Sequence, residues 1–203
     1  MSFTTSYTPH YLSMTDILVT EERISCKTEE PLPRLGFLDV TSDSPDLKKG
    51  TKLELPFWLA QSLHCRRRPI VSVEIPKVYK ESYREILEAD ACAVTLSKWN
   101  PYYYELGMLV AQLNSRESES IKNSLILTFK SRIKLIVDWA QNPYSDVTLF
   151  NQLPFLEKNL FSIGRKARNT LIDWLKEGSG NIEKSELVAN FMKKRKREEF
   201  ETH

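Results

Sequence analysis

The spacing of apolar residues changes near Pro76, and this change constrains the fold more than any other feature of the sequence. Before Pro76 the apolar residues lie in short runs, some alternating with polar residues and separated by turn-forming residues. After Pro76 they recur every three or four residues over long stretches. Alternation is typical of a half-buried strand, and the longer spacing is typical of an amphipathic helix. We therefore predict an α+β protein, with a small β-containing N-terminal domain over residues 1–75 and a mainly α-helical bundle domain over residues 76–180.

The N-terminal region is predicted to contain short strands and two short helices. Ser13 or Thr15 can cap the first helix. Pro56 can end a strand and begin the second helix, because the first helical position needs no amide proton. Polar residues together with Pro and Gly predict a loop over residues 41–50. The expected strands cover residues 23–28, 51–55 and 70–75, and the expected helices cover residues 13–19 and 57–63.

The C-terminal region is predicted to contain about four helices. The first ends near Asp90, and Asn100 followed by Pro101 is a start signal for the second. The apolar face expected for the first helix consists of Val78, Tyr79, Tyr83, Ile86 and Leu87. The second helix, up to Leu113, has few polar residues, and a helix that is apolar on nearly every side must be covered on every side. Either its own domain surrounds it or a partner does.

The third and fourth helices each have one apolar stripe. In the third, over residues 119–140, the stripe is Leu125, Phe129, Ile133, Ile136 and Ala140. Four cations lie largely outside it, namely Lys122, Lys130, Arg132 and Lys134. The stripe of the fourth is Leu149, Leu153, Leu156, Leu160, Ile163, Ala167, Leu171 and Trp174. Pro154 is expected to kink the fourth helix or to mark its true start.

Charge is nearly balanced, with 29 Lys and Arg against 27 Asp and Glu, so no global basic field favours generic nucleic-acid binding. Two basic clusters remain. Arg66, Arg67 and Arg68 could contact phosphates, but a solvated loop that protects a strand edge is the favoured interpretation. Residues 181–203 are expected to form a basic, flexible tail. Its run Lys193, Lys194, Arg195, Lys196 and Arg197 resembles a nuclear import signal; a nucleic-acid contact and a solvated tail are the alternatives.

The rare residue types give no catalytic, cofactor-binding or metal-binding set. His64 beside Cys65 suggests a Cys and His hydrolase, but adjacent helical residues point in different directions and no third orienting group is evident. His10 and His203 have no suitable neighbours, no Cys-x-x-Cys pattern suggests zinc, and no Gly-rich loop suggests a nucleotide. We interpret the four tryptophans as core or subunit-contact residues in preference to residues that stack on bases; they are Trp58, Trp99, Trp139 and Trp174. We therefore predict a protein that is not an enzyme.

The compartment follows from the cysteines and the N-terminus. Cys26, Cys65 and Cys92 are odd in number and widely spaced, and residues 1–16 lack the apolar run of a signal peptide. A reducing, intracellular compartment fits best. Nor does any apolar stretch approach the roughly 20 residues that span a bilayer. A soluble protein is expected.

Four segments carry a resemblance to a known family. They are residues 12–18, 33–36 (Pro-Arg-Leu-Gly), 52–60 (Lys-Leu-Glu-Leu-Pro-Phe-Trp-Leu-Ala) and 71–79 (Val-Ser-Val-Glu-Ile-Pro-Lys-Val-Tyr). In this order and with these gaps, they resemble the corresponding segments of the GINS subunit family, and within it the third Psf subunit. The resemblance implies four related subunits, each with a small β domain and a helical domain, whose helical domains pack together.

The resemblance also implies a function. The chain would be a non-catalytic scaffold of the GINS heterotetramer in the nucleus, required for the CMG helicase in the initiation and elongation of chromosomal DNA replication. Its partners would be three other GINS subunits, the minichromosome-maintenance helicase and a RecJ-like protein, with no membrane and only indirect DNA contact. Its expected subunit contacts are Tyr102, Tyr103, Tyr104, Leu106, Met108 and Leu109. The alternative is a nucleic-acid-binding module that uses residues 66–68 and 193–197.

Overall fold

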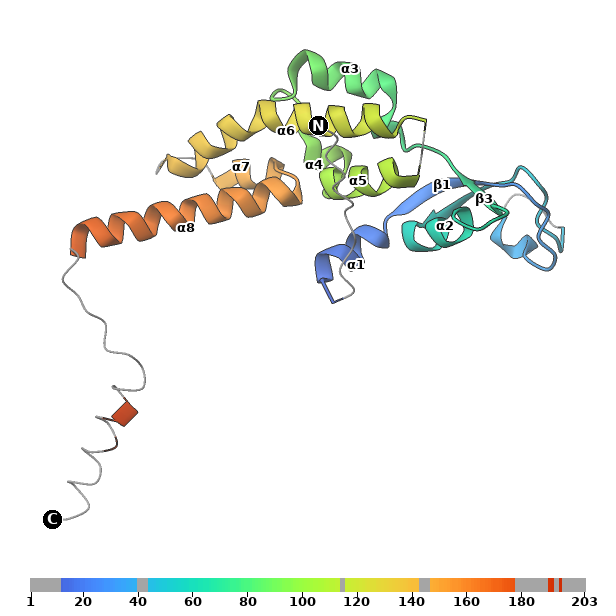
Figure 1. Ribbon diagram of the computed structural model, residues 1–203, viewed down its shortest axis with the longest axis horizontal. Helices are drawn as coiled ribbons and strands as arrows, with labels where there is room; N and C mark the ends of the chain where they lie inside the picture. Colours follow the sequence, from blue (N-terminus) through green and yellow to red (C-terminus); the bar gives the residue numbers. More distant parts are fainter. Residues whose placement is uncertain are drawn as a thin grey trace. The chain divides into compact units, whose positions relative to one another are not determined.

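A computed structural model describes residues 12–39, 44–113, 116–142 and 147–177, together with residues 190, 191 and 194 (Figure 1). Its chain divides into two compact units, residues 1–162 and 163–203, and each is described by itself. The described residues form eight α-helices and one three-stranded antiparallel sheet. The predicted α+β class is therefore confirmed.

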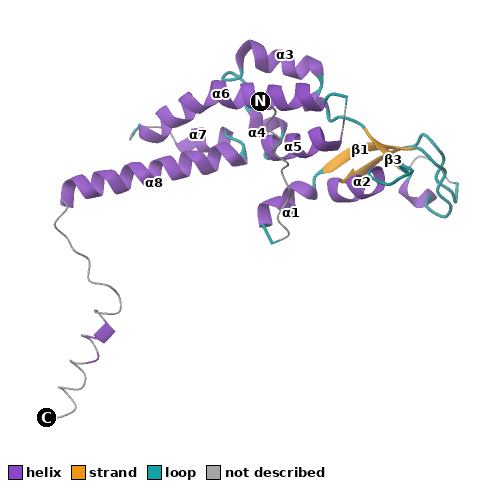
Figure 2. Ribbon diagram, in the orientation of Figure 1, coloured by secondary structure: helices purple, strands orange, loops and turns teal. Residues whose placement is uncertain are grey.

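The sheet belongs to the N-terminal part of the first unit, where Figure 2 draws its strands in orange. Its strands are β1 (Arg23–Thr28), β2 (Lys52–Pro56) and β3 (Val71–Val73), in the order β2-β1-β3. Alternate residues of β1 are buried, and Cys26 lies opposite Leu53 of β2 and Val73 of β3. One face of the sheet therefore contributes to the core, as the alternating sequence predicts.

Two short helices accompany the sheet. In α1 (Met14–Thr20), the Ser13 hydroxyl accepts a hydrogen bond from the Asp16 amide at 3.4 Å, which confirms the expected cap. The helix α2 (Phe57–His64) begins one residue after Pro56, which ends β2 and occupies the cap position rather than the first helical position. The strand β3 is shorter than predicted. A 3₁₀ turn at Gly36–Leu38 was not foreseen, and part of the predicted loop at 41–50 lies outside the described residues.

The helical part contains more elements than the spacing predicted. The first predicted helix divides into a 3₁₀ turn at Lys77–Tyr79 and α3 (Glu81–Asp90), and Ile86 is exposed although it was assigned to the buried face. The short helix α4 (Leu96–Trp99) was not predicted. The helix α5 (Tyr103–Leu113) follows the expected start signal, because the side-chain oxygen of Asn100 accepts a hydrogen bond from the Tyr102 amide at 2.6 Å.

The remaining helices are α6 (Ser118–Gln141), α7 (Val147–Gln152) and α8 (Phe155–Glu177). Pro154 precedes α8, so it marks a true helix start, and the residues before it form a separate helix. Within the first unit, α5 packs against α6 at Gly107, where a Cβ atom would lie 2.9 Å from atoms of Leu125 and Tyr79. A glycine at this position lets the two helices approach closely.

One apolar core extends from the sheet into the helices. The same cluster contains Ile24 of β1, Phe57 of α2, Leu109 of α5 and Leu125 of α6. The core is therefore continuous across the predicted boundary at residue 75. The domain limits at residues 75 and 180 stay predictions.

Candidate subunit interface

The helix α5 is covered by its own chain. The four residues Tyr103, Tyr104, Leu106 and Leu109 are buried, with no side chain more than 5% exposed, whereas Tyr102 and Met108 are partly buried. Tyr79 stacks on Tyr103 and donates a hydrogen bond to its carbonyl oxygen at 2.8 Å. This apolar helix could be buried by its own domain or by a partner, and its own domain provides most of the burial. The four buried side chains offer little surface to another subunit in this structure, whereas the assignment of subunit contacts to these six residues stays a prediction.

Arg132 was expected outside the apolar stripe of α6, but it is 4% exposed and forms part of a buried polar cluster. Its Nε donates to Glu157 Oε1 at 2.7 Å and its Nη2 donates to Glu157 Oε2 at 2.9 Å. Tyr104 Oη donates to Glu157 Oε1 at 2.7 Å. These three residues, Tyr104, Arg132 and Glu157, are called the Arg132 cluster below. Sequence reasoning missed it because a lone Glu and a lone Arg on different helices carry no local signal.

The Arg132 cluster satisfies the hydrogen-bonding needs of its members. The remaining guanidinium nitrogen of Arg132 donates to the carbonyl oxygens of Ala91 and Val94, at 2.6 and 2.9 Å. A bidentate Arg–carboxylate pair with further partners is the geometry in which a buried ion pair is tolerated. Burial, and then the Glu157 charge, raise the pKa of Tyr104, so its hydroxyl stays protonated and remains a donor. The cluster therefore joins α5, α6, the start of α8 and the turn after α3.

The second unit presents the opposite pattern, with apolar side chains exposed on α8. Ile163, Leu171, Trp174 and Leu175 are between 56% and 65% exposed, and they are called the α8 stripe below. Their spacing of eight, three and one residues places them near one face of a helix. The sequence predicted Ile163, Leu171 and Trp174 as a continuation of the stripe through Leu153, and the structure adds Leu175. Leu153 is buried, whereas the four residues of the α8 stripe are exposed. The α8 stripe is the candidate interface.

His64 and Cys65 lie in different environments at the end of α2. His64 Nδ1 lies 3.1 Å from the Val71 carbonyl oxygen, and Cys65 is exposed at the end of α2. Burial, together with the Glu74 charge, raises the pKa of Cys26 to about 11, so this thiol is protonated near neutral pH. Within the described ranges, no group of His, Cys, Asp and Glu residues could hold a metal ion. His10 and His203 lie outside the described residues.

The basic clusters and tryptophans fall in different environments. Arg66, Arg67 and Arg68 are exposed in the turn between α2 and β3. Of the terminal cations, Lys193, Arg195, Lys196 and Arg197 lie outside the described residues, and Lys194 is exposed. Trp99 packs edge-on against Tyr83 and Tyr103 in the core and Trp139 is partly buried, whereas Trp58 and Trp174 are about half exposed. No helix in the described part of the chain is long and apolar enough to cross a membrane.

Exposed apolar side chains along the distal part of a long helix are typical of the class of subunits built for a larger assembly. Comparisons with known proteins give the family. A family model described as the PSF3 N-terminal domain matches residues 12–65. The DNA replication complex GINS protein PSF3 of Xenopus laevis is 39% identical over 188 residues, covering 92% of this chain and 90% of that protein.

Two other relatives agree. The protein of the same name from Mus musculus is 41% identical over 193 residues, covering 92% of this chain and 89% of that protein. The probable DNA replication complex GINS protein PSF3 of Dictyostelium discoideum is 29% identical over 177 residues, covering 86% of this chain and 65% of that protein. The chain belongs to the PSF3 family of GINS subunits. The resemblance predicted from its sequence segments is therefore confirmed.

Proposed function

We propose that this protein serves chromosomal DNA replication as a non-catalytic scaffold subunit of the GINS heterotetramer. In this role it makes no covalent bond and needs no cofactor. Its partners are three other GINS subunits and, through the tetramer, the minichromosome-maintenance helicase and its RecJ-like partner in the CMG helicase. The proposal rests on family membership and on one structural observation, the exposed α8 stripe.

The α8 stripe supports scaffolding because apolar area gains free energy when it leaves water, at about 25 cal/mol per Å². Interfaces of obligate complexes are more apolar than other surfaces and resemble a divided core. Trp174 adds a large aromatic side chain of the kind that often dominates binding energy. We therefore propose that a sibling subunit covers the α8 stripe.

Localisation and DNA contact complete the proposal. The run at residues 193–197 acts as a nuclear import signal, in keeping with a role at replication forks. DNA contact by this subunit is indirect. Its mechanism is positional: the Arg132 cluster fixes the interior of the first unit, and the exposed apolar helix presents a surface for assembly.

Coexpression with the three siblings tests the proposal. Expressed alone, the chain should be poorly soluble, and the siblings should make it soluble. Combining Leu171→Asp with Trp174→Ser should reduce copurification by about tenfold or more, because charge and lost area oppose burial. The matched variant Leu171→Met keeps an apolar side chain and should assemble normally. A monodisperse monomer that ignores its siblings, or normal assembly of the doubly substituted chain, would refute the proposal.

A nucleic-acid-binding module is the second candidate, favoured by the exposure of all three arginines at residues 66–68. Such a module would bind DNA with a steep dependence on salt concentration, because cations displace counterions from phosphates. Replacing Arg66, Arg67 and Arg68 by Gln would then lower DNA affinity and flatten the salt dependence. Unchanged affinity for DNA would exclude this second candidate, and the scaffold function would be the one that remains.

A further inference from the structure

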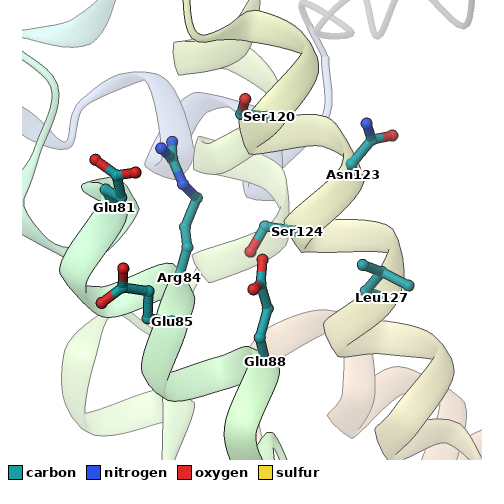
Figure 3. Close-up of a pocket in the computed structure, with 8 residues that line it drawn as sticks. All are labelled: Glu81, Arg84, Glu85, Glu88, Ser120, Asn123, Ser124 and Leu127. Carbon is teal, nitrogen blue, oxygen red and sulfur yellow. The ribbon is translucent and has the colours of Figure 1, made fainter.

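A groove lies between α3 and α6, and the scaffold function assigns no role to the residues that line it. It has a volume of about 350 Å³ and lies within the first unit. Figure 3 shows the side chains that line it, from α3 on one side and α6 on the other. They are Glu81, Arg84, Glu85, Glu88, Ser120, Asn123, Ser124 and Leu127.

The groove has an excess of negative charge. Three carboxylates, Glu81, Glu85 and Glu88, line it against one cation, Arg84. Arg84 is already engaged, because its Nη1 donates to Glu117 Oε2 at 2.9 Å and to the Tyr79 carbonyl oxygen at 3.2 Å. The only lining cation is thus paired with a carboxylate outside the lining set, and the three lining carboxylates remain to attract a positive ligand.

Ser124 supplies a second, independent indication of a ligand. It is 4% exposed, and its hydroxyl oxygen is buried without a hydrogen-bond partner among the described residues. Ser131, one of the later residues of the same helix, donates to the Leu127 carbonyl oxygen four residues earlier at 2.9 Å. Ser124 forms no such bond, and Figure 3 shows its hydroxyl and the Glu88 carboxylate pointing into the space between the helices. A buried hydroxyl left unpaired costs free energy that a ligand donor would recover.

The chemistry of the lining narrows the class of ligand. A phosphate or nucleic acid would meet three carboxylates and be repelled. A metal ion is not favoured, since no group of His, Cys, Asp and Glu in the described part of the chain could hold one. A guanidinium carries a positive charge and five donors in a plane, which suits acceptors spread over two helices. Leu127, 52% exposed, offers an apolar surface to the methylene stem of the same side chain.

We propose that the groove between α3 and α6 binds an arginine side chain from the surface of a partner protein, with Glu88 and Ser124 as its acceptors. The groove belongs to the first unit, and the α8 stripe belongs to the second. This protein therefore has a charge-selective docking site in addition to its apolar assembly surface. The inference does not depend on which subunit covers the α8 stripe.

Nuclear magnetic resonance of leucine methyl groups tests the site directly. The full chain, alone or reconstituted with unlabelled siblings, is labelled at leucine methyls, and the Leu127 signals are assigned with a Leu127→Ile variant. N-acetylarginine amide is the probe, and its uncharged analogue N-acetylcitrulline amide is the control. We expect saturable shifts of the Leu127 signals with the arginine probe and none with the citrulline control.

Substitutions then locate the acceptors. Glu88→Gln should raise the Kd for the arginine probe by about tenfold and Ser124→Ala by about threefold, as expected for a charged and a neutral hydrogen bond. The matched variant Glu54→Gln, at an exposed position on β2, removes the same charge and should leave the Kd unchanged. Glu88 is exposed, so its substitution should not disturb folding. Equal shifts with citrulline, an equal effect of Glu54→Gln, or no saturable shift would overturn the site, whether or not the chain assembles with its siblings.

Discussion

The helix α5 and the distal part of α8 both contain apolar side chains that the sequence predicts to be buried, but their environments are opposite. In α5, Leu109 is 1% exposed and the chain's own core surrounds it. In α8, Leu171 is 56% exposed. The comparison teaches that an apolar pattern indicates that a helix must be buried. It does not indicate whether the same chain or another molecule buries it.

The start of α8 and the α8 stripe also differ in burial. Glu157, a charged residue, is fully buried, whereas Trp174, a large apolar residue, is about half exposed. The first is stabilised by Arg132 and Tyr104. The second has no such neighbours in the described part of the chain. The interior of the first unit is therefore fixed by a specific polar arrangement, and the α8 stripe remains available for association.

The largest effect is expected from breaking the Arg132 cluster. Arg132→Ala leaves the Glu157 carboxylate buried without its counterion, which typically costs about 3–5 kcal/mol. Amide hydrogen exchange of α5 and α6 in the assembled complex should report this loss as a lower free energy of opening. Arg84→Ala, which removes a more exposed ion pair, is the control, with a cost on the order of 1 kcal/mol. Equal effects of the two substitutions would mean that the Arg132 cluster is not specially stabilising.

The comparison between the two helices is tested by the same substitution in each. Leu109→Ala should reduce the stability of the first unit by about 2–5 kcal/mol, because it leaves a cavity in the core. Leu171→Ala should change the stability of that unit by less than about 0.5 kcal/mol and should instead weaken assembly. Hydrogen exchange of α5 and copurification with the siblings measure the two effects. The comparison fails if Leu171→Ala lowers protection of α5 as much as Leu109→Ala does.

The smallest effect concerns Glu105 at the start of α5. Burial chiefly, with a contribution from Asp16, raises the pKa of its carboxyl, and Glu105 Oε2 has no hydrogen-bond partner among the described residues. A carboxyl whose pKa is higher in the folded state than in the unfolded state destabilises the fold when ionised. Stability should therefore rise as the pH falls from neutral through the folded-state pKa.

Glu105→Gln removes this ionisation and should stabilise the chain by on the order of 1 kcal/mol near neutral pH. The gain should shrink as the pH is lowered, because the carboxyl then becomes protonated. Hydrogen exchange at two pH values, corrected for the intrinsic rate, measures it. Glu54→Gln, on an exposed face of β2, should show neither effect. A gain that is independent of pH would contradict the assignment to Glu105 ionisation.

Local sequence patterns determined much of the fold of this protein. The strand predicted at residues 23–28 has the bounds of β1, and Asn100 and the choice of Ser13 or Thr15 predicted helix starts through backbone groups close in sequence. Pro154 indicated either a kink or a helix start, because proline cannot continue the backbone hydrogen bonds of a helix, and the structure has a helix start. The family was indicated by four segments in a particular order along the chain, at residues 12–18, 33–36, 52–60 and 71–79. All of these signals act over a few residues or depend on order along the chain.

Tertiary structure alone decided which apolar helix is buried and which charged residues are inside. Arg132 belongs to a cationic set that spacing placed outside the core, yet Glu157, 25 residues away, brings it inside through two hydrogen bonds. The burial of α5 and the exposure of the α8 stripe likewise depend on which segments pack together. Hydrophobic periodicity records the need for burial, whereas pairing between distant residues depends on the three-dimensional path of the chain. For this reason the sequence determined the elements and the family, and the tertiary structure decided which apolar side chains are exposed.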